Sequence, residues 1–462
     1  MHSAEARRVF VGPTEVAGVA HGIAEGLRRI GVDAELVLEA DHAFGYAASA
    51  ARGWPVGPWR RLGTAFRARR RAGLADWPAW AALHGLLAWL VLAWAIWRFD
   101  TFVYIAGNAI TRSVAEWILL RLLGKRVVVV FLGSDARPPY INGVFGGSDG
   151  GALAREARRV KRRVTRIERW VSACINAPGT AHFHERAVVN WFAIGFPRFV
   201  AAAARGAVPA RAPGDRVVLV HSPSLAVAKG TEEIQRIVEQ MQARGLPVEL
   251  RILQGLPNAA VVDALREADL VVDQLYSDTP MAGLATEAAQ LARPALVGGY
   301  FAAHAARALA GLAPIPSRFV LPEEFGAALE DLVRDEAQRR TLGSAALAFV
   351  QDHWSCEQVA RRLMRLLSAP APALRAAGVA QPTGSPGATR RAGAGEVDVP
   401  AHWWFDPATV DYLHGCGLSE AAARDRVARL VAERGVGALQ LADKPALEAA
   451  FVAWARGAGG AA

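Results

Sequence analysis

A lysine at the expected start of a helix is the first residue placed for chemistry. The predicted strand 216–221 leads through a short turn to Lys229-Gly230-Thr231, where a helical pattern begins. An ammonium group beside a glycine at a helix start is suited to neutralising a diphosphate. Only four residues of the chain are lysines. This scarcity favours a specific use over the alternative, a solvated lysine at a helix end.

A glycine loop followed by a carboxylate forms the second group. Residues 277–288 read SDTPMAGLATEA and stand between the predicted strands 269–274 and 294–298. Loop amides can hold phosphate oxygens while Glu287, on the new helix, accepts hydrogen bonds from ribose hydroxyls. The pattern suits a sugar nucleotide. The structural alternative is a helix N-terminus capped by Asp278 or Thr279, with Glu287 on a solvated face.

Two glycines mark a third candidate, at the first strand-to-helix turn. Gly12-Pro13 ends the predicted strand 8–12, and Gly18 lies at the beginning of the next helix. Backbone N–H groups of such a turn, with the helix dipole behind them, can face an anion. Because any Rossmann-like first turn contains glycine, a phosphate role and a purely structural role both stay open.

Several other chemistries are not expected. Cys174, Cys356 and Cys416 are widely spaced and show neither a disulfide pattern nor zinc-ligand spacing, which predicts a reducing compartment and no standard zinc site. Neither paired carboxylates at glycosidase-like positions nor a Ser/His/Asp order is evident. Hydrolysis is therefore not expected.

The elements that must position these residues alternate between strands and helices. Apolar runs of strand length recur with helical patterns between them. The runs lie at 8–12, 34–38, 101–105, 126–132, 171–177, 216–221, 247–253, 269–274 and 294–298. Alternating βαβ units predict parallel sheets with helices on both faces. The expected fold is α/β, with two Rossmann-like doubly wound domains whose strand ends form a ligand-binding cleft.

Composition divides the chain further. We predict a first domain at 1–202, a linker rich in proline and glycine at 203–215, and a second domain at 216–368. Residues 369–399 are poor in large apolar side chains and are expected to be a disordered linker. The pattern of 400–462 predicts a small helical appendage.

One segment of the first domain is apolar enough to concern a membrane. Residues 79–97 contain four tryptophans, and His84 is their only polar side chain. Their length formally permits a transmembrane helix, but the segment stands inside a βαβ series. A buried helix, a helix on the membrane surface and a true span stay open. The tryptophans and the upstream arginines favour an interfacial location over a dry core.

The charge balance has two explanations: heavy use of arginine mostly reflects codon bias in a GC-rich genome, and a pI near 10 also permits an anionic partner. The chain carries 53 basic and 43 acidic residues, a formal charge of +10, and arginines cluster at 60–71 and 155–169. Neither cluster has interleaved aromatic residues or a nucleic-acid motif, so we expect peripheral contact with an anionic membrane and no nucleic acid. No secretory signal pattern opens the sequence. The protein is expected in the cytoplasm, including the inner face of the cytoplasmic membrane.

The order of these motifs resembles that of the GT-B glycosyltransferases, specifically retaining family 4 (glycosyl transferases group 1). The likeness covers 8–367 and is most specific over 217–300, which holds the Lys-Gly-Thr start, the ADLVVDQ strand and the G-L-x-T-E-A turn. It implies a protein that moves a sugar from a nucleotide-sugar donor to a cell-envelope, polysaccharide or lipid-linked acceptor of a bacterium. It further implies retained configuration, no metal, and no cofactor apart from the donor as co-substrate.

The same resemblance assigns roles to particular residues. Lys229 would contact the donor diphosphate and stabilise it as it leaves, and the loop 133–137 would meet the donor sugar or the acceptor. The implied catalytic residues are Lys229, Asp135 and Asp278. The implied donor-binding residues are Gly12, Gly18, Lys229, Gly230, Gly283, Leu284 and Glu287.

Three positions depart from the family pattern. Leu132 stands in place of a histidine, Ala226 in place of an arginine, and Thr279 in place of a glutamate. Asp278 is therefore the candidate for holding the sugar hydroxyls. Two alternatives stay open: a catalytically weak relative that serves as a binding or scaffold subunit, and a sugar-nucleotide epimerase.

Overall fold

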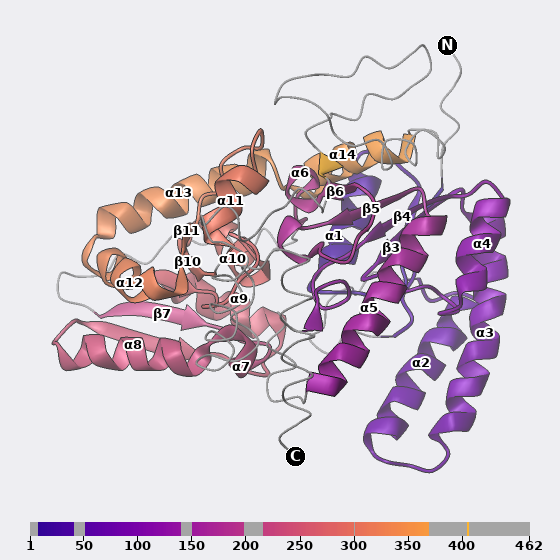
Figure 1. Ribbon diagram of the computed structural model, residues 1–462, viewed down its shortest axis with the longest axis horizontal. Coiled ribbons are helices and arrows are strands. Elements are labelled where there is room, and N and C mark those ends of the chain that lie inside the picture. Colours follow the sequence, from indigo (N-terminus) through magenta and orange to yellow (C-terminus); the bar gives the residue numbers. More distant parts are fainter. Residues whose placement is uncertain are drawn as a thin grey trace.

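Two parallel sheets, each packed between helices, form the body of the protein (Figure 1). The computed structural model describes residues 8–40, 51–139, 150–197, 216–299, 301–368 and 404–405. The expected α/β fold with two Rossmann-like doubly wound domains is confirmed. The predicted linkers 203–215 and 369–399 lie outside the described residues, as does the predicted appendage 400–462 apart from 404–405.

The first sheet contains six parallel strands in the order β2-β1-β3-β4-β5-β6. Val9 and Val11 belong to one apolar cluster and Phe10 to another, so both faces of the sheet are buried. The chain order reverses between β1 and β3, and folds of this type bind ligands beyond the carboxyl ends of the strands at such a point. The strands are β1 (Val9–Gly12), β2 (Ala34–Leu36), β3 (Thr101–Ile105), β4 (Arg126–Val130), β5 (Ala173–Asn176) and β6 (Val188–Asn190).

Helices cover the two faces of this sheet unequally. On one face, α1 buries Ile23 and Leu27 together with α6. On the other face, α5 buries Val164 and Ile167 beside α2, α3 and α4. β12 (Trp404–Phe405) pairs antiparallel with β6 at the edge. The helices are α1 (Val19–Arg29), α2 (Val56–Arg71), α3 (Trp77–Arg98), α4 (Val114–Leu122), α5 (Gly150–Trp170) and α6 (Trp191–Ile194).

The second sheet is also parallel, with the strand order β8-β7-β9-β10-β11. The order in which the chain adds strands reverses between β7 and β9. Its strands are β7 (Val217–His221), β8 (Val248–Ile252), β9 (Leu270–Val272), β10 (Ala295–Gly298) and β11 (Arg318–Val320). Its helices are α7 (Ala226–Lys229), α8 (Thr231–Ala243), α9 (Asn258–Glu267), α10 (Gly283–Ala289), α11 (Ala302–Ala308), α12 (Phe325–Arg334) and α13 (Glu336–Asp352).

The helix α14 (Cys356–Ser368) crosses back from the second domain to the first. It packs on α1 so closely that a Cβ atom at Gly26 would lie 2.0 Å from the carbonyl oxygen of Cys356. Arg29 pairs with Glu357 across the same contact at 2.9 Å. Although its sequence belongs to the range predicted for the second domain, α14 covers a face of the first.

The helices α2 and α3 form an antiparallel hairpin that projects from the first sheet (Figure 1). One side of α3 is buried through Val91, Leu92 and Ala95, whereas Leu86 is 69% and Trp97 81% exposed. The strands that flank the hairpin in the sequence, β2 and β3, both pair with β1. If α3 alone crossed a membrane, β2 and β3 would lie on opposite sides and could not both pair with β1. They could do so only if α2, with its six arginines, crossed the membrane as well.

Candidate functional site

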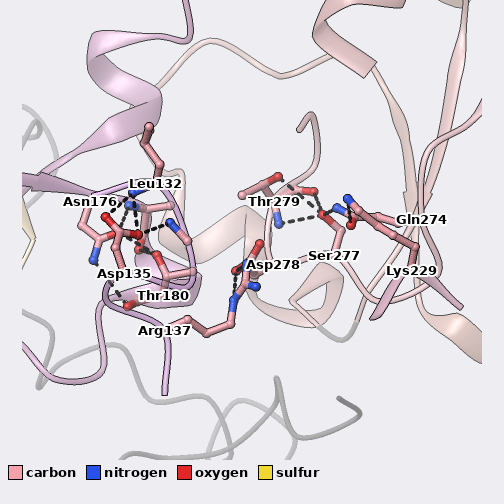
Figure 2. Close-up of polar contacts among 12 residues, drawn as sticks. Leu132, Asp135, Arg137, Asn176, Thr180, Lys229, Gln274, Ser277, Asp278 and Thr279 are labelled. Carbon is pink, nitrogen blue, oxygen red and sulfur yellow. Dashed lines mark hydrogen bonds and ion pairs between the residues drawn. The ribbon is translucent and has the colours of Figure 1, made fainter. Parts of the chain in front are cut away.

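The carboxyl ends of the two sheets face each other across a cleft of about 490 Å³. Its first-domain wall is formed by the loops after β1, β4 and β5, and its second-domain wall by the turns after β7, β8 and β9 and by the start of α10. Figure 2 shows one group of polar side chains on each side, with Arg137 and Asp278 between them. The structure thus brings together residues that lie far apart in the sequence.

Lys229 reaches this cleft from the last position of α7. The next residue, Gly230, has a φ of 69° and joins α7 to α8. A Cβ atom there would lie 2.7 Å from Cβ of Leu275, so both the backbone conformation and the space require glycine. The Lys-Gly pair predicted from the sequence is therefore a positioned lysine next to an obligatory turn.

The ammonium group of Lys229 lies among polar atoms of the two residues that directly follow β9. Nζ donates a hydrogen bond to Oε1 of Gln274 and lies 4.0 Å from Oδ1 of Asp273. Burial lowers the pKa of Lys229, while the negative charge of Asp273 acts in the opposite direction. An anion in the cleft would compensate the desolvation of this cation.

Gln274 connects Lys229 to the next turn. Its Nε2 donates to Oγ of Ser277 at 2.7 Å, and that hydroxyl donates to the carbonyl oxygen of Thr279 at 2.6 Å. The backbone N–H of Thr279 donates back to Oγ of Ser277 at 3.1 Å. The turn before α10 is thereby held in one conformation, through main-chain atoms of Thr279 rather than a carboxylate.

Arg137 and Asp278 join the two domains across the cleft (Figure 2). Nε of Arg137 donates to Oδ2 of Asp278 at 2.8 Å, and a second guanidinium N–H donates to the same oxygen. Gly179 lies against this loop, since a Cβ atom there would lie 2.6 Å from the carbonyl oxygen of Asp278. Asp278, the predicted sugar-binding carboxylate, therefore lies in the cleft and is paired with a cation of the opposite domain.

The carboxylate of Asp135 is bound by its own loop, whereas its implied catalytic role would require it to face a substrate. Its carboxylate accepts hydrogen bonds from the backbone N–H groups of Leu132, at 3.1 Å, and Gly133, at 2.7 Å. Burial raises its pKa, and these two N–H groups act against that rise. In this conformation Asp135 holds the loop that carries Arg137; a catalytic role stays a prediction.

Glu287 is buried in the second-domain wall of the cleft, one turn into α10. Nδ2 of Asn258, at the start of α9, donates to its Oε1 at 3.0 Å. Gly283 and Leu284, the first residues of α10, line the same wall. Glu287, Gly283 and Leu284 therefore lie on one wall of the cleft, and their binding of a donor stays a prediction.

Gly12 and Gly18 have conformations that explain their residue type. Gly12 has a φ of 154° and packs so tightly that a Cβ atom would lie 2.0 Å from the carbonyl oxygen of Val37. Gly18 has a φ of 81° at the N-terminus of α1. The cleft wall nearby is formed by Val16, Ala17 and Val19 rather than by these glycines. Their contact with a donor stays a prediction.

A buried polar network supports the first-domain wall. Oδ1 of Asn176, at the end of β5, accepts from Oγ1 of Thr180 at 2.6 Å. Nδ2 of Asn176 lies 3.1 Å from Nε2 of His184, whose Nδ1 lies 3.0 Å from Oε2 of Glu168 on α5. Thr180 lines the cleft, so the network fixes part of its wall.

Sequence reasoning did not identify several of these residues. Asn258, Asp273, Gln274 and Arg137 received no individual role. Gln274 is the last residue of the predicted parallel strand 269–274, and this position at a carboxyl end is the signal that could have found it. Within the described part of the chain, no group of three or more His, Cys, Asp or Glu residues could hold a metal ion.

Two Rossmann-like domains with the ligand cleft between them define the GT-B architecture. No protein-family model matches the chain, and no curated protein sequence matches it. The chain is similar to the solved structure of Anabaena Alr3699/HepE in complex with UDP-glucose, with 13% identity, coverage of 78% of this chain and 98% of that chain, and a TM-score of 0.43.

Two further similarities are of the same kind. The catalytic domain of starch synthase IV from Arabidopsis thaliana, bound to ADP and acarbose, shows 10% identity over 78% of this chain and 99% of that chain, with a TM-score of 0.45. A proposed UDP-N-acetylglucosamine 2-epimerase from Listeria monocytogenes shows 13% identity over 79% of this chain and 96% of that chain, with a TM-score of 0.38. At these scores, the strand order of the two sheets remains the basis for the architecture.

Proposed function

We propose that the protein is a glycosyltransferase that transfers a sugar from a nucleotide donor with retention of configuration and without a metal. The observation that carries this proposal is the convergence of Lys229, Glu287 and the start of α10 on one cleft, opposite Arg137 of the other domain. The acceptor we propose is a bacterial cell-envelope glycan or a lipid-linked glycan. No cofactor apart from the donor is required.

In this proposal each domain wall has its own task. Glu287 accepts hydrogen bonds from the ribose, and the amides of Gly283 and Leu284 bind phosphate oxygens. The bond between the sugar C1 and the diphosphate oxygen breaks, and the electron pair stays on the diphosphate. Lys229 and Arg137 stabilise that growing charge. An acceptor hydroxyl forms the new bond to C1, and its proton passes to the oxygen of the departing diphosphate. Asp278 holds hydroxyls of the transferred sugar.

The first prediction is a selective thermal shift by nucleoside diphosphates. UDP, GDP and ADP, and their sugars, are to be tested against the full chain, and we expect at least one diphosphate to raise Tm more than its own monophosphate does. The reason is that Lys229 and Arg137 supply positive charge for the second phosphate. A chain whose Tm responds to none of these compounds would contradict the proposed donor site.

One observation favours a second candidate, a binding subunit with weak catalysis. Thr279 contributes main-chain hydrogen bonds to its turn and presents no carboxylate. Release of nucleoside diphosphate that depends on an acceptor would exclude this candidate. The sugar-nucleotide epimerase is distinguished in the same assay, because it would convert the donor without any acceptor.

The α2–α3 hairpin supports a peripheral contact with an anionic membrane at the cytoplasmic face. Leu83, Leu86, Leu90 and Trp97 are exposed on α3 at a spacing that places them along one face of the helix. Of the helices in the described ranges, α3 is long and apolar enough to span a bilayer by length and composition. Arg69 and Arg70 of α2 lie over the rings of Trp80 and Trp77 at the start of α3. A helix lying on the membrane surface is the arrangement we propose.

The second prediction is salt-sensitive flotation with liposomes that contain phosphatidylglycerol. The double variant Leu86→Asp/Leu90→Asp should lose flotation, because two carboxylates replace apolar side chains at the surface that enters the headgroup region. Leu122→Asp/Leu123→Asp is the matched control, since it adds the same charge at two leucines that are 77% and 49% exposed at the end of α4. Flotation that is absent in the unmodified protein at low and high salt, or that is equal in both variants, would contradict this contact.

A further inference from the structure

A hollow of about 770 Å³ lies between α5 and the segment that joins β3 to α4, and arginines dominate its walls. The α5 arginines recur at intervals of three and four residues, which places them along one face of that helix. They are Arg155, Arg158, Arg159, Arg162, Arg163 and Arg166. Arg112, before α4, adds a seventh guanidinium group. We call this hollow the arginine groove.

No carboxylate lines the arginine groove among the residues that the structure describes. Arg159 pairs with Glu156 and Arg112 with Glu39, each at 2.6 Å. The other described wall arginines form no ion pair with a described carboxylate, so the groove retains a large positive charge. Like charges gathered this closely repel one another. An anionic ligand would relieve that repulsion.

The geometry of the guanidinium group selects among anions. Arginine presents paired N–H groups that match two oxygens of a phosphate. Arg163 fixes the floor, because its Nη2 donates to the carbonyl oxygens of Ala106 and Gly107 at 2.8 and 2.9 Å. Most of the wall arginines are exposed, so their guanidinium groups are accessible from solvent. Among them are Arg155, Arg158, Arg162 and Arg166.

The arginine groove lies next to the first-domain wall of the cleft. Gly107, in the groove, packs against Phe131, which lines the cleft; a Cβ atom at Gly107 would lie 2.8 Å from the Phe131 ring. Arg112 is tied through Glu39 to Arg67 of α2, at 2.6 and 2.8 Å. The groove therefore lies between the cleft and the hairpin proposed to contact the membrane.

We infer that the arginine groove binds a phosphate or diphosphate group carried by the acceptor. That the ligand is an acceptor rests on the proposed function, whereas the binding of an anion is inferred from the arginine groove alone. A lipid headgroup and a soluble phosphorylated glycan supply the same chemistry. In either case the groove anchors the charged part of the acceptor while its hydroxyl enters the neighbouring cleft.

The test is calorimetric titration with inorganic pyrophosphate, the third prediction. It uses the full chain carrying Lys229→Ala, which we expect to weaken binding of free pyrophosphate at the proposed donor site because pyrophosphate already carries the charge of the departed diphosphate. Adding Arg158→Ala/Arg162→Ala should weaken pyrophosphate binding at least ten-fold. Adding Arg236→Ala/Arg361→Ala, two exposed arginines of α8 and α14, removes the same charge and should change it less than two-fold.

The outcomes separate the groove from the proposed function. Absence of pyrophosphate binding, or an equal loss in both double variants, would overturn the groove. Binding of a single-stranded oligonucleotide that depends on Arg158 and Arg162, in a protein that does not bind pyrophosphate, would also overturn the assignment of a phosphate site. The protein could also bind no nucleoside diphosphate and still lose pyrophosphate binding only in Arg158→Ala/Arg162→Ala. That result would support the anion site and contradict its role as an acceptor site.

A vesicle arm identifies the source of the phosphate. Phosphatidylcholine vesicles with and without phosphatidic acid are compared for the groove variant and its control. Selective loss of binding to the phosphatidic acid vesicles supports a lipid headgroup. Selective loss confined to pyrophosphate in solution supports a soluble phosphorylated acceptor.

Discussion

Replacing Lys229 by alanine is expected to lower kcat by roughly 100- to 1,000-fold, the size of effect seen when one charge-stabilising group is removed from a transition state. The affinity for the nucleotide sugar should fall much less, because negative charge on the diphosphate grows as the sugar leaves. Turnover is to be measured as donor consumption and affinity by calorimetry. Lys161→Ala, on α5 and outside the cleft lining, is the control.

The pH profile gives this prediction a second readout. Because burial lowers the pKa of Lys229, kcat/KM should fall as the pH rises through that lowered pKa and the ammonium loses its charge. Lys229→Arg should remove the alkaline fall, since arginine stays charged. Equal losses of kcat and affinity in Lys229→Ala would instead indicate a purely ground-state role.

Replacing Glu287 by glutamine is expected to weaken binding of the nucleoside diphosphate about ten-fold or more, since losing a charged acceptor costs roughly 1.5–3 kcal/mol. Glutamine preserves the shape and can still accept from Nδ2 of Asn258. The hydroxyls of the ribose would then meet a neutral amide. Calorimetry on the purified variant measures the effect.

Two controls accompany Glu287→Gln. Glu239→Gln makes the same change on an exposed position of α8. Thr279→Ala should change little, because its short hydrogen bonds use main-chain atoms. If affinity and turnover are unchanged in both Glu287→Gln and Lys229→Ala, the donor site is not where we place it.

Local patterns were sufficient to predict most of the fold. The predicted strands occur close to their predicted ranges, since strands buried on both faces give continuous apolar runs. The strands β6 and β11 were not predicted, although β2 and β9 are equally short and were found. The helix α2 was also missed, because its arginines mask the apolar side that Trp59 and Phe66 bury.

The candidate site was predictable where its residues are neighbours in the sequence. Lys229 with Gly230, and Gly283 with Glu287, each lie within a single turn and were found. The pairing of Arg137 with Asp278 was not, because it depends on how two domains face each other. Asp135 shows a different limit. The family resemblance implied a catalytic role for it, but the backbone N–H groups that its carboxylate binds cannot be read from a sequence.

The crossing of α14 has a consequence during synthesis of the chain on the ribosome. The six parallel strands of the first sheet and α1 are complete by Asn190, yet Ala360 and Leu363, which join their apolar cluster, emerge only much later. At about 5–20 residues per second, the intervening chain takes on the order of ten to thirty seconds to appear. During that interval the α1 side of the nascent first domain exposes apolar surface, which makes it a natural client for chaperones that hold unfinished chains.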